Sequence, residues 1–227
     1  MAGVRIINPI DKIIRGSHLR KIRFHDEKGN RVDLAGAVLA PLALFFAVLR
    51  VTTGYRPQMP TISFRATRAI GSLIEKDWKI AEFGSGMSTP WLGRRCGFLL
   101  SIESDEHWYR KVNDMLRAQS LDNVRCELRE PARYCDLSGY SDGFFDFALI
   151  DGLDRAGCVR SVAPKIRRGG WIYLDNSDKD MTRPGGDLRR AEEGLLREIE
   201  ERGGSVRYFV DFSPTNFFVE QGMLARL

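Results

Sequence analysis

Acidic and amide side chains stand at the ends of four β-prone runs in this sequence. They are, in chain order, Glu82, Glu103, Asp151, Asp175 and Asn176. The carboxyl ends of parallel strands share one edge of a sheet, which is where ligands bind in such folds. Carboxylates at that edge can accept hydrogen bonds from a ribose, hold a divalent cation or take a proton from a substrate hydroxyl.

The first acid heads a glycine-rich loop that runs from Glu82 to Pro90. Gly84 and Gly86 let the backbone take positive φ angles and let a ligand approach closely. Thr89 is a good N-cap, and proline suits the first turn of the helix that should follow. The sequence therefore predicts a nucleotide-cradling loop between a strand and a helix.

Glu103 lies about 20 residues beyond this loop, a spacing typical of an acid that binds a ribose 2′/3′ diol. The alternative is a carboxylate at a helix start, where the macrodipole favours negative charge. Because strand, loop and spacing agree, the ribose interpretation is favoured.

Alternating strands and helices must position these residues. Strands are expected at 78–83, 98–102, 124–128, 145–150 and 171–174. Helices are expected at 62–75, from Thr89, at 105–118, up to about Ile166 and at 187–201, before a hairpin of 206–212 and 216–220. This order predicts a doubly wound α/β fold with a mostly parallel sheet of seven strands, one of them antiparallel.

Two further phrases, Phe145-Asp-Phe-Ala-Leu-Ile-Asp-Gly152 and Arg168-Gly-Gly-Trp-Ile-Tyr-Leu-Asp-Asn176, accompany the loop. With them, residues 62–224 resemble the class I S-adenosylmethionine-dependent methyltransferases. The resemblance implies a Rossmann-like fold and S-adenosylmethionine as cofactor. It implies cofactor contacts from Glu82, Gly84, Ser85, Gly86, Ser88, Thr89, Glu103, Ser104, Trp108 and Asp151, with Ser104 and Trp108 near the adenine. For Trp108, packing in a helix core is an equal alternative.

A nicotinamide-dependent oxidoreductase is the competing enzyme hypothesis. Its loop carries three spaced glycines around a pyrophosphate, whereas Ser88 stands at the third position here. S-adenosylmethionine has no phosphate and carries positive charge, which suits an acid at the head of the loop. A catalytically inactive, membrane-associated binding module of the same fold is the non-enzyme alternative.

Asp151 and Asp175-Asn176 resemble the divalent-metal triad of catechol-type and caffeoyl-CoA-type O-methyltransferases, which implies Mg²⁺ there. Those enzymes place a lysine three residues after the first aspartate, where this chain has Asp154. The alternative is that Asp175-Asn176 only caps a loop.

The phrase Asp151-Gly-Leu-Asp-Arg-Ala-Gly-Cys158 is similar to one in bacterial methyltransferases, some of which accompany glycan-modifying genes. Asp151 is expected to act as general base or to orient the substrate. Arg155 is expected either to clamp a carboxylate or phosphate of the acceptor or to form an ion pair with a neighbouring aspartate. The expected reaction is O-methylation of a hydroxyl or carboxyl on a small molecule or glycan.

Residues 1–54 form an accessory segment before the expected catalytic domain, 55–227. Residues 1–32 hold eight basic and three acidic residues, a net charge of +5 that equals that of the whole chain. Because the rest is neutral, a nucleic-acid substrate is disfavoured.

Residues 34–49 are uncharged and apolar but short for a membrane span. Two interpretations remain open. The segment packs on the domain or across a homodimer interface, or residues 1–50 contact a membrane surface. In either case a cytoplasmic domain is expected, peripheral at the inner membrane face in the second.

Overall fold

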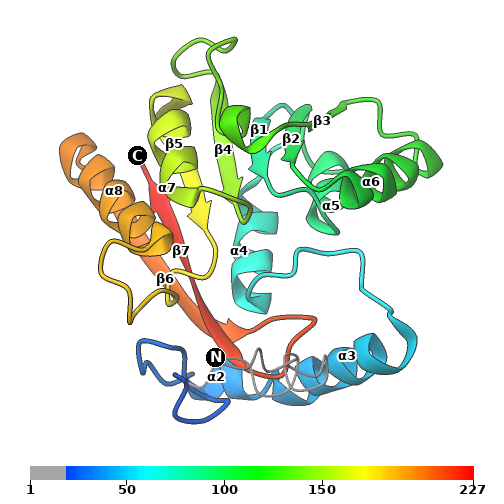
Figure 1. The fold of residues 1–227 in the computed structure, drawn as a ribbon, viewed down its shortest axis with the longest axis vertical. Coiled ribbons are helices and arrows are strands. Elements are labelled where there is room, and N and C mark those ends of the chain that lie inside the picture. The colour runs from blue at the N-terminus through cyan, green and yellow to red at the C-terminus, as the bar shows by residue number, and fades with distance from the viewer. Residues whose placement is uncertain (1–18) are drawn as a thin grey trace, which may run out of the picture.

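The computed structural model describes residues 19–227 (Figure 1). A single seven-stranded sheet forms its centre, with helices against both faces (Figure 1). The strands are β1 (Lys79–Phe83), β2 (Phe98–Glu103), β3 (Val124–Leu128), β4 (Phe145–Ile150), β5 (Ile166–Leu174), β6 (Ser205–Phe212) and β7 (Val219–Arg226). The helices are α2 (Leu34–Ala37), α3 (Ala40–Thr53), α4 (Phe64–Leu73), α5 (Ser88–Gly93), α6 (Glu106–Ala118), α7 (Arg155–Val162) and α8 (Asp187–Arg202).

The strand order is β3-β2-β1-β4-β5-β7-β6. The first five strands in this order are parallel, and β7 is antiparallel to both of its neighbours, β5 and β6. The predicted α/β fold with one antiparallel strand is therefore confirmed. β1 lies between β2 and β4, so the ends of these three strands meet at the point where the strand order reverses.

Alternation along β1 divides its side chains between two cores. Ile80 packs with α4 and α5 on one face, whereas Ala81 and Phe83 pack with α7 and α8 on the other. Because side chains alternate across a strand, Glu82 points to the same face as Ile80, beneath α5. This local rule decides what Glu82 can contact.

Three predicted boundaries are wrong. β5 begins at Ile166 rather than Trp171, since α7 ends at Val162 and the residues before the Gly169-Gly170 pair already belong to the strand. The helix after the glycine loop starts at Ser88, so Thr89 is not its N-cap.

The last strand is 219–226 rather than 216–220. A glycine in its middle, Gly222, conceals the strand in the sequence. The glycine is required because a Cβ there would lie 1.8 Å from the Tyr173 hydroxyl of the neighbouring strand.

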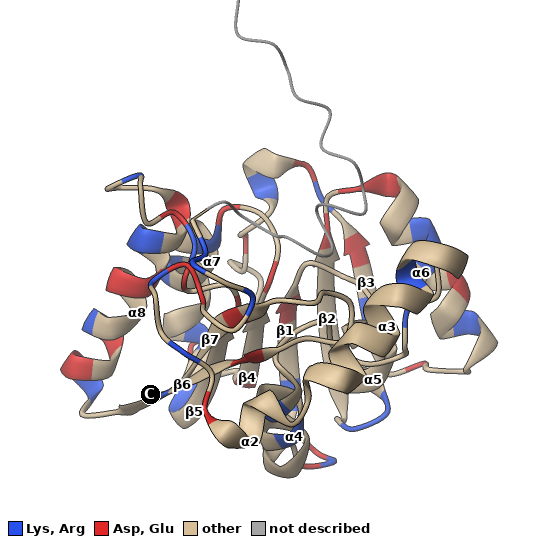
Figure 2. Ribbon diagram, turned by 90° about the horizontal axis from the view of Figure 1, so that it is seen from below, with Lys and Arg blue, Asp and Glu red and all other residues tan. Residues whose placement is uncertain are grey.

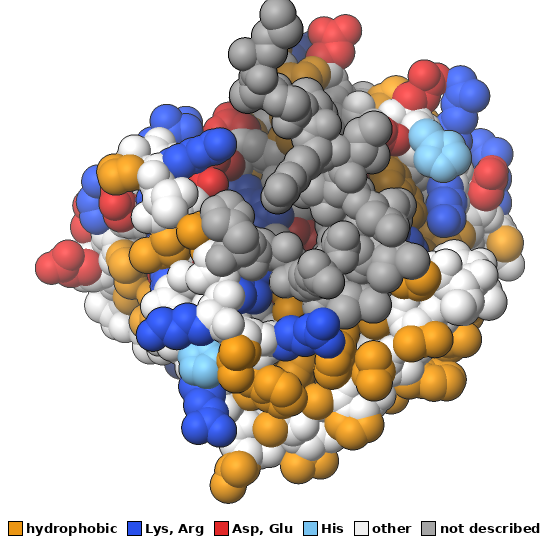
Figure 3. Space-filling model, turned by 60° about the horizontal axis from the view of Figure 1, so that its bottom comes forward, with side chains coloured by type: hydrophobic (Ala, Val, Ile, Leu, Met, Phe, Trp, Pro, Cys, Tyr) orange, Lys and Arg blue, Asp and Glu red, His pale blue; other side chains and the backbone are white. Residues whose placement is uncertain are grey.

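The segment before α4 packs on the ends of β6 and β7. Arg20 donates to the Val219 carbonyl at 3.0 Å and pairs with Asp178 at 3.5 Å. Farther along, Arg50 donates to the Asn216 side chain at 2.9 Å. The outward face of α2 and α3 carries few charged residues (Figure 2) and presents a hydrophobic surface (Figure 3).

Candidate active site

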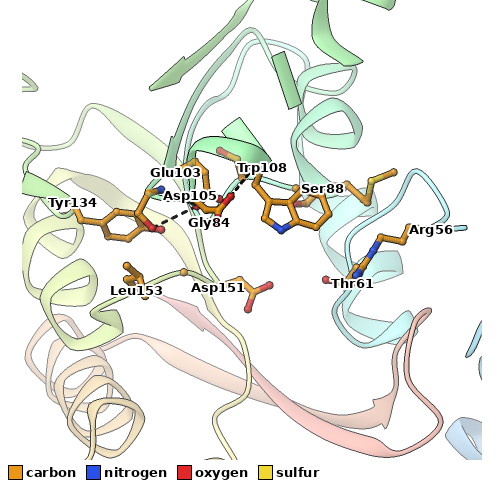
Figure 4. Close-up of a pocket in the computed structure, with 15 residues that line it drawn as sticks. Arg56, Thr61, Gly84, Ser88, Glu103, Asp105, Trp108, Tyr134, Asp151 and Leu153 are labelled. Atoms are coloured by element: carbon orange, nitrogen blue, oxygen red, sulfur yellow. Dashed lines mark hydrogen bonds between the residues drawn. The ribbon is translucent and has the colours of Figure 1, made fainter. Parts of the chain in front are cut away.

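A cavity of about 420 Å³ opens at the carboxyl ends of β1, β2 and β4 (Figure 4). This volume suits a nucleotide-sized ligand. Eight predicted site residues line it: Gly84, Ser85, Gly86, Ser88, Glu103, Ser104, Trp108 and Asp151. The sequence reasoning missed Arg56, Thr61, Met87, Asp105, Tyr134, Gly152 and Leu153, which also line it.

Gly84 lets the first loop approach the end of β4. Its φ is +97°, and a Cβ there would lie 2.9 Å from the backbone nitrogen of Gly152. Gly152 is equally constrained, since a Cβ on it would lie 1.8 Å from the Tyr134 hydroxyl. Two backbones and a buried tyrosine thus form the inner wall of the cavity, and only glycine fits at both positions.

Gly86 faces open space instead. A Cβ at this position would meet nothing closer than the Ser88 hydroxyl, at 4.0 Å. Because Gly86 also lines the cavity, the missing side chain leaves room for a ligand rather than for the protein.

Glu82 lies under the glycine loop and not in the cavity. Its side chain is fully buried, and it accepts hydrogen bonds from the hydroxyls of Ser88, Thr89 and Ser101, the last two at 2.7 and 2.6 Å. Burial raises the pKa of Glu82 to about 7, although the hydroxyls oppose the shift. Glu82 and Thr89 therefore hold the loop from beneath, and the expected direct contact of either with a cofactor is not supported by their positions.

Glu103 is held at the cavity wall by the turn that follows β2. Its Oε1 accepts from the backbone nitrogens of Ser104 and Asp105 at 2.7 and 2.8 Å. No hydrogen bond to its Oε2 is recorded within residues 19–227. Oε1 thus orients the carboxylate, and Oε2 can accept a hydrogen bond from a ligand. The two interpretations of Glu103, at a helix start and in ligand binding, are therefore compatible, because each concerns a different oxygen.

Trp108 projects from the first turn of α6 toward the cavity and is not part of the core (Figure 4). The Arg56 guanidinium lies 5.4 Å from the centroid of its ring. Arg56 comes from the two-proline connector before α4, and nothing in the sequence marks such a residue as part of a site. It is the only Lys or Arg among the described residues that line the cavity.

Asp151 and Arg155 form a close ion pair beside the cavity. Arg155 Nη2 donates to Asp151 Oδ1 at 2.8 Å and to the Asp151 carbonyl at 3.1 Å, and Nη1 donates to the Asp175 carbonyl. Nε donates to the Gly152 carbonyl at 3.2 Å. Burial raises the pKa of Asp151, and the Arg155 guanidinium opposes that shift. Arg155 follows the ion-pair alternative, with its donors directed at the protein.

Comparison with known proteins places the fold. No family model matches the chain, and no curated protein sequence matches it. A Klebsiella pneumoniae protein described as a candidate O-methyltransferase is 18% identical, with 85% of this chain and 99% of that chain covered at a TM-score of 0.60. The precorrin-6y C5,15-methyltransferase of Geobacter metallireducens GS-15 is 16% identical, with 76% and 100% covered at a TM-score of 0.53.

The chain has the class I methyltransferase fold. TYW2 of M. jannaschii, solved in complex with AdoMet, shares it at 12% identity, with 78% of each chain covered and a TM-score of 0.52. The chain spans 64% of the length of a further match, from Bordetella parapertussis. At sequence identities this low, the structural similarity establishes the fold alone. The reaction has to be inferred from the site.

In this methyltransferase fold, the triad predicted to hold Mg²⁺ does not fit a divalent ion. Oxygens of Asp151 and Asn176 face the Arg155 guanidinium, and the Asp175 carboxylate accepts from the Tyr173 hydroxyl at 3.3 Å. Within residues 19–227, no group of three or more His, Cys, Asp or Glu is arranged to hold a metal. The Arg155 guanidinium thus contacts side-chain oxygens of two of the three predicted ligands, Asp151 and Asn176.

Proposed function

We propose that the protein is an S-adenosylmethionine-dependent methyltransferase that methylates an oxygen of a small molecule or glycan. The observation that carries the proposal is the cavity itself. It brings together the open glycine loop, an oriented carboxylate at Glu103, the ring of Trp108 and the carboxylate of Asp151. The first three suit the methionine, ribose and adenine parts of S-adenosylmethionine, and Asp151 is left to act on the acceptor.

The chain supplies a place for each part of the cofactor. The Glu103 carboxylate would accept from the ribose hydroxyls, and the Trp108 ring offers an apolar surface to the adenine. The backbone of Gly84 to Gly86 would contact the methionine part, which needs the space left at Gly86. When bound, S-adenosylmethionine supplies an activated methyl group on a sulfonium.

Asp151 is the carboxylate best placed to take the proton of the acceptor. Two other carboxylates line the cavity, but Glu103 is held by backbone amides, and Asp105 Oδ1 accepts from the Trp108 backbone nitrogen at 2.8 Å. The bound cofactor would supply the methyl group to the acceptor oxygen and keep the electron pair on its sulfur, and Asp151 would take the proton that the acceptor loses. The raised pKa of Asp151 favours this role.

Arg56 favours an acceptor with an anionic group. Its guanidinium is the one cationic side chain in the wall of the cavity among the described residues. It also lies over Trp108, so it would stand near both cofactor and acceptor. A carboxylate or phosphate on the acceptor would pair with it.

Transfer of a labelled methyl group tests the proposal. The purified full-length protein is incubated with labelled S-adenosylmethionine and pools of hydroxylated or carboxylated small molecules and glycans. We expect incorporation that falls at least about tenfold in Arg56→Ala when the acceptor is anionic, as expected for loss of a charge-assisted contact. The exposed Arg110→Ala serves as the matched control. A cofactor that binds but transfers no methyl group to any pool would contradict the proposed reaction.

A further inference from the structure

The α2–α3 segment is built with its large apolar side chains outward. Its inward face is made of small residues, Gly36, Ala40, Ala43 and Ala47, all of them buried. Its outward face exposes Leu34, Val38, Leu42, Leu44, Phe45 and Val48, with exposed fractions of 87% at Leu34 and 57% at Phe45. A surface helix of a soluble domain has the opposite arrangement, with its large apolar residues toward the core.

This outward face is uncharged and continuous. No Asp, Glu, Lys or Arg occurs between Leu34 and Leu49. Among the described residues, Leu34–Thr53 is the one helical stretch long and apolar enough to cross a membrane. Its mean hydropathy is 2.2, and 22% of its most apolar part is buried. Figure 3 shows the hydrophobic side chains gathered over this end of the molecule.

The contacts of the segment favour lying in the membrane surface over crossing it. Ala40 and Ala43 of its small face pack with Phe212 and Val219, and Arg50 near its far end donates to Asn216. A spanning orientation would have to break these contacts. A helix of this kind can instead bury its outer face in the headgroup and acyl boundary while its inner face stays on the domain.

Basic residues border the apolar face. Lys21 and Arg31 are exposed near Ile22, itself 56% exposed, and Arg31 shares a groove with Ile22 and Leu34. The one acid in this groove, Asp33, pairs with Arg65 at 2.8 Å. Residues 1–32 carry a net charge of +5 in the sequence, of which Arg20 and Lys28 are held in ion pairs with Asp178 and Glu192 and do not belong to this border. Each basic residue near an anionic bilayer contributes about 1 kcal/mol of attraction. A second copy suits the face less well, because a two-fold contact would bring the same basic border close to itself.

We infer that the outer face of α2 and α3 docks this protein on an anionic bilayer surface, with the helices in the plane of the membrane. The apolar side chains enter the lipid, and the basic border contacts the headgroups. This inference is independent of the reaction proposed above, because no side chain of α2 or α3 lines the cavity.

Flotation of the full-length protein with lipid vesicles tests the inference. The variant Val38→Glu/Phe45→Glu places two charges on the face, and Leu196→Glu places one at a 40% exposed leucine on α8 as the control. We expect wild type and Leu196→Glu to float with phosphatidylglycerol-containing vesicles. The double variant should partition at least about tenfold less, because each charge opposes burial in lipid. Vesicles of phosphatidylcholine alone should bind wild type more weakly.

Two readouts separate the alternatives. Thermal unfolding of the double variant should match wild type, because the two side chains are exposed. Equal partitioning of wild type and double variant would overturn the inference. So would a wild type that is dimeric by light scattering, ignores vesicles and becomes monomeric on substitution, since a second copy would then cover the face.

Discussion

Nη2 of Arg155 lies 2.8 Å from Oδ1 of Asp151, and the same guanidinium reaches the carbonyl of Asp175 and the side chain of Asn176. One cation thus ties together the loops that follow β4 and β5. Because Arg155 begins α7, the helix, the two loops and the cavity wall are coupled through a single side chain. This pairing positions Asp151, which we regard as the proton acceptor, and makes Arg155 a positioning residue.

Asp151→Asn should abolish most turnover while leaving cofactor binding nearly intact. The amide keeps the size of the side chain but cannot accept the acceptor proton, and general-base catalysis contributes roughly 10²–10⁴-fold. Turnover of labelled S-adenosylmethionine and calorimetry with S-adenosylhomocysteine would separate the two effects. The exposed Asp142→Asn is the control. Unchanged turnover in Asp151→Asn would remove this residue from the chemistry.

Removal of divalent ions should leave turnover unchanged. Asp151 already has a cationic partner in the Arg155 guanidinium, so no metal ion is needed to neutralise it. The measurement compares rates after EDTA treatment and after added Mg²⁺. Loss of activity in EDTA that Mg²⁺ restores would contradict the arrangement.

Arg155→Lys should lower kcat more than it raises KM, because an ammonium cannot make the same set of directed contacts.

Stability should depend on the protonation of Glu82. The folded-state pKa of Glu82 is raised from 4.5 to about 7, so between these values the folded protein holds a proton that the unfolded chain releases. The free energy of unfolding should therefore fall as pH rises through this window, by up to about 3 kcal/mol, and then level off.

Glu82→Gln should remove this dependence. Between about pH 5 and about pH 8, the Tm of this variant should rise relative to that of wild type by roughly 6–12 °C, because about 3 kcal/mol of stability is lost by wild type over this window. The reference variant is Glu103→Gln. Parallel curves for wild type and Glu82→Gln would show that the buried carboxyl does not titrate in this range.

The two loop glycines should respond differently to a side chain. Gly86→Leu should keep the Tm of wild type but weaken S-adenosylhomocysteine binding at least about tenfold, because its side chain takes cavity space. Gly84→Ala should instead cost about 1–3 kcal/mol of stability, from its positive φ and its close approach to Gly152. Tight binding by Gly86→Leu would place the cofactor elsewhere.

The sequence predicts the sheet and the residues that follow its strands well, because alternation and glycine spacing are local signals. It does not predict that Glu82 is directed beneath α5, although strand alternation from Ile80 could have indicated it. Arg56 and Tyr134 reach the cavity from a connector and from the chain after β3, so only the tertiary arrangement identifies them. The strand around Gly222 is hidden for the same reason, since this glycine is required by the Tyr173 side chain on the neighbouring strand.

The direct test of the central claim is calorimetry of S-adenosylhomocysteine binding to the full-length protein and to Glu103→Ala. Loss of hydrogen bonds to a charged group costs about 1.5–3 kcal/mol, so the variant should bind roughly 10–100-fold more weakly. Glu106→Ala, an exposed acid three residues farther on, should bind as wild type does. Micromolar binding by wild type with that loss in Glu103→Ala is the predicted result. No binding by wild type at millimolar ligand, or equal binding by Glu103→Ala, would contradict the account.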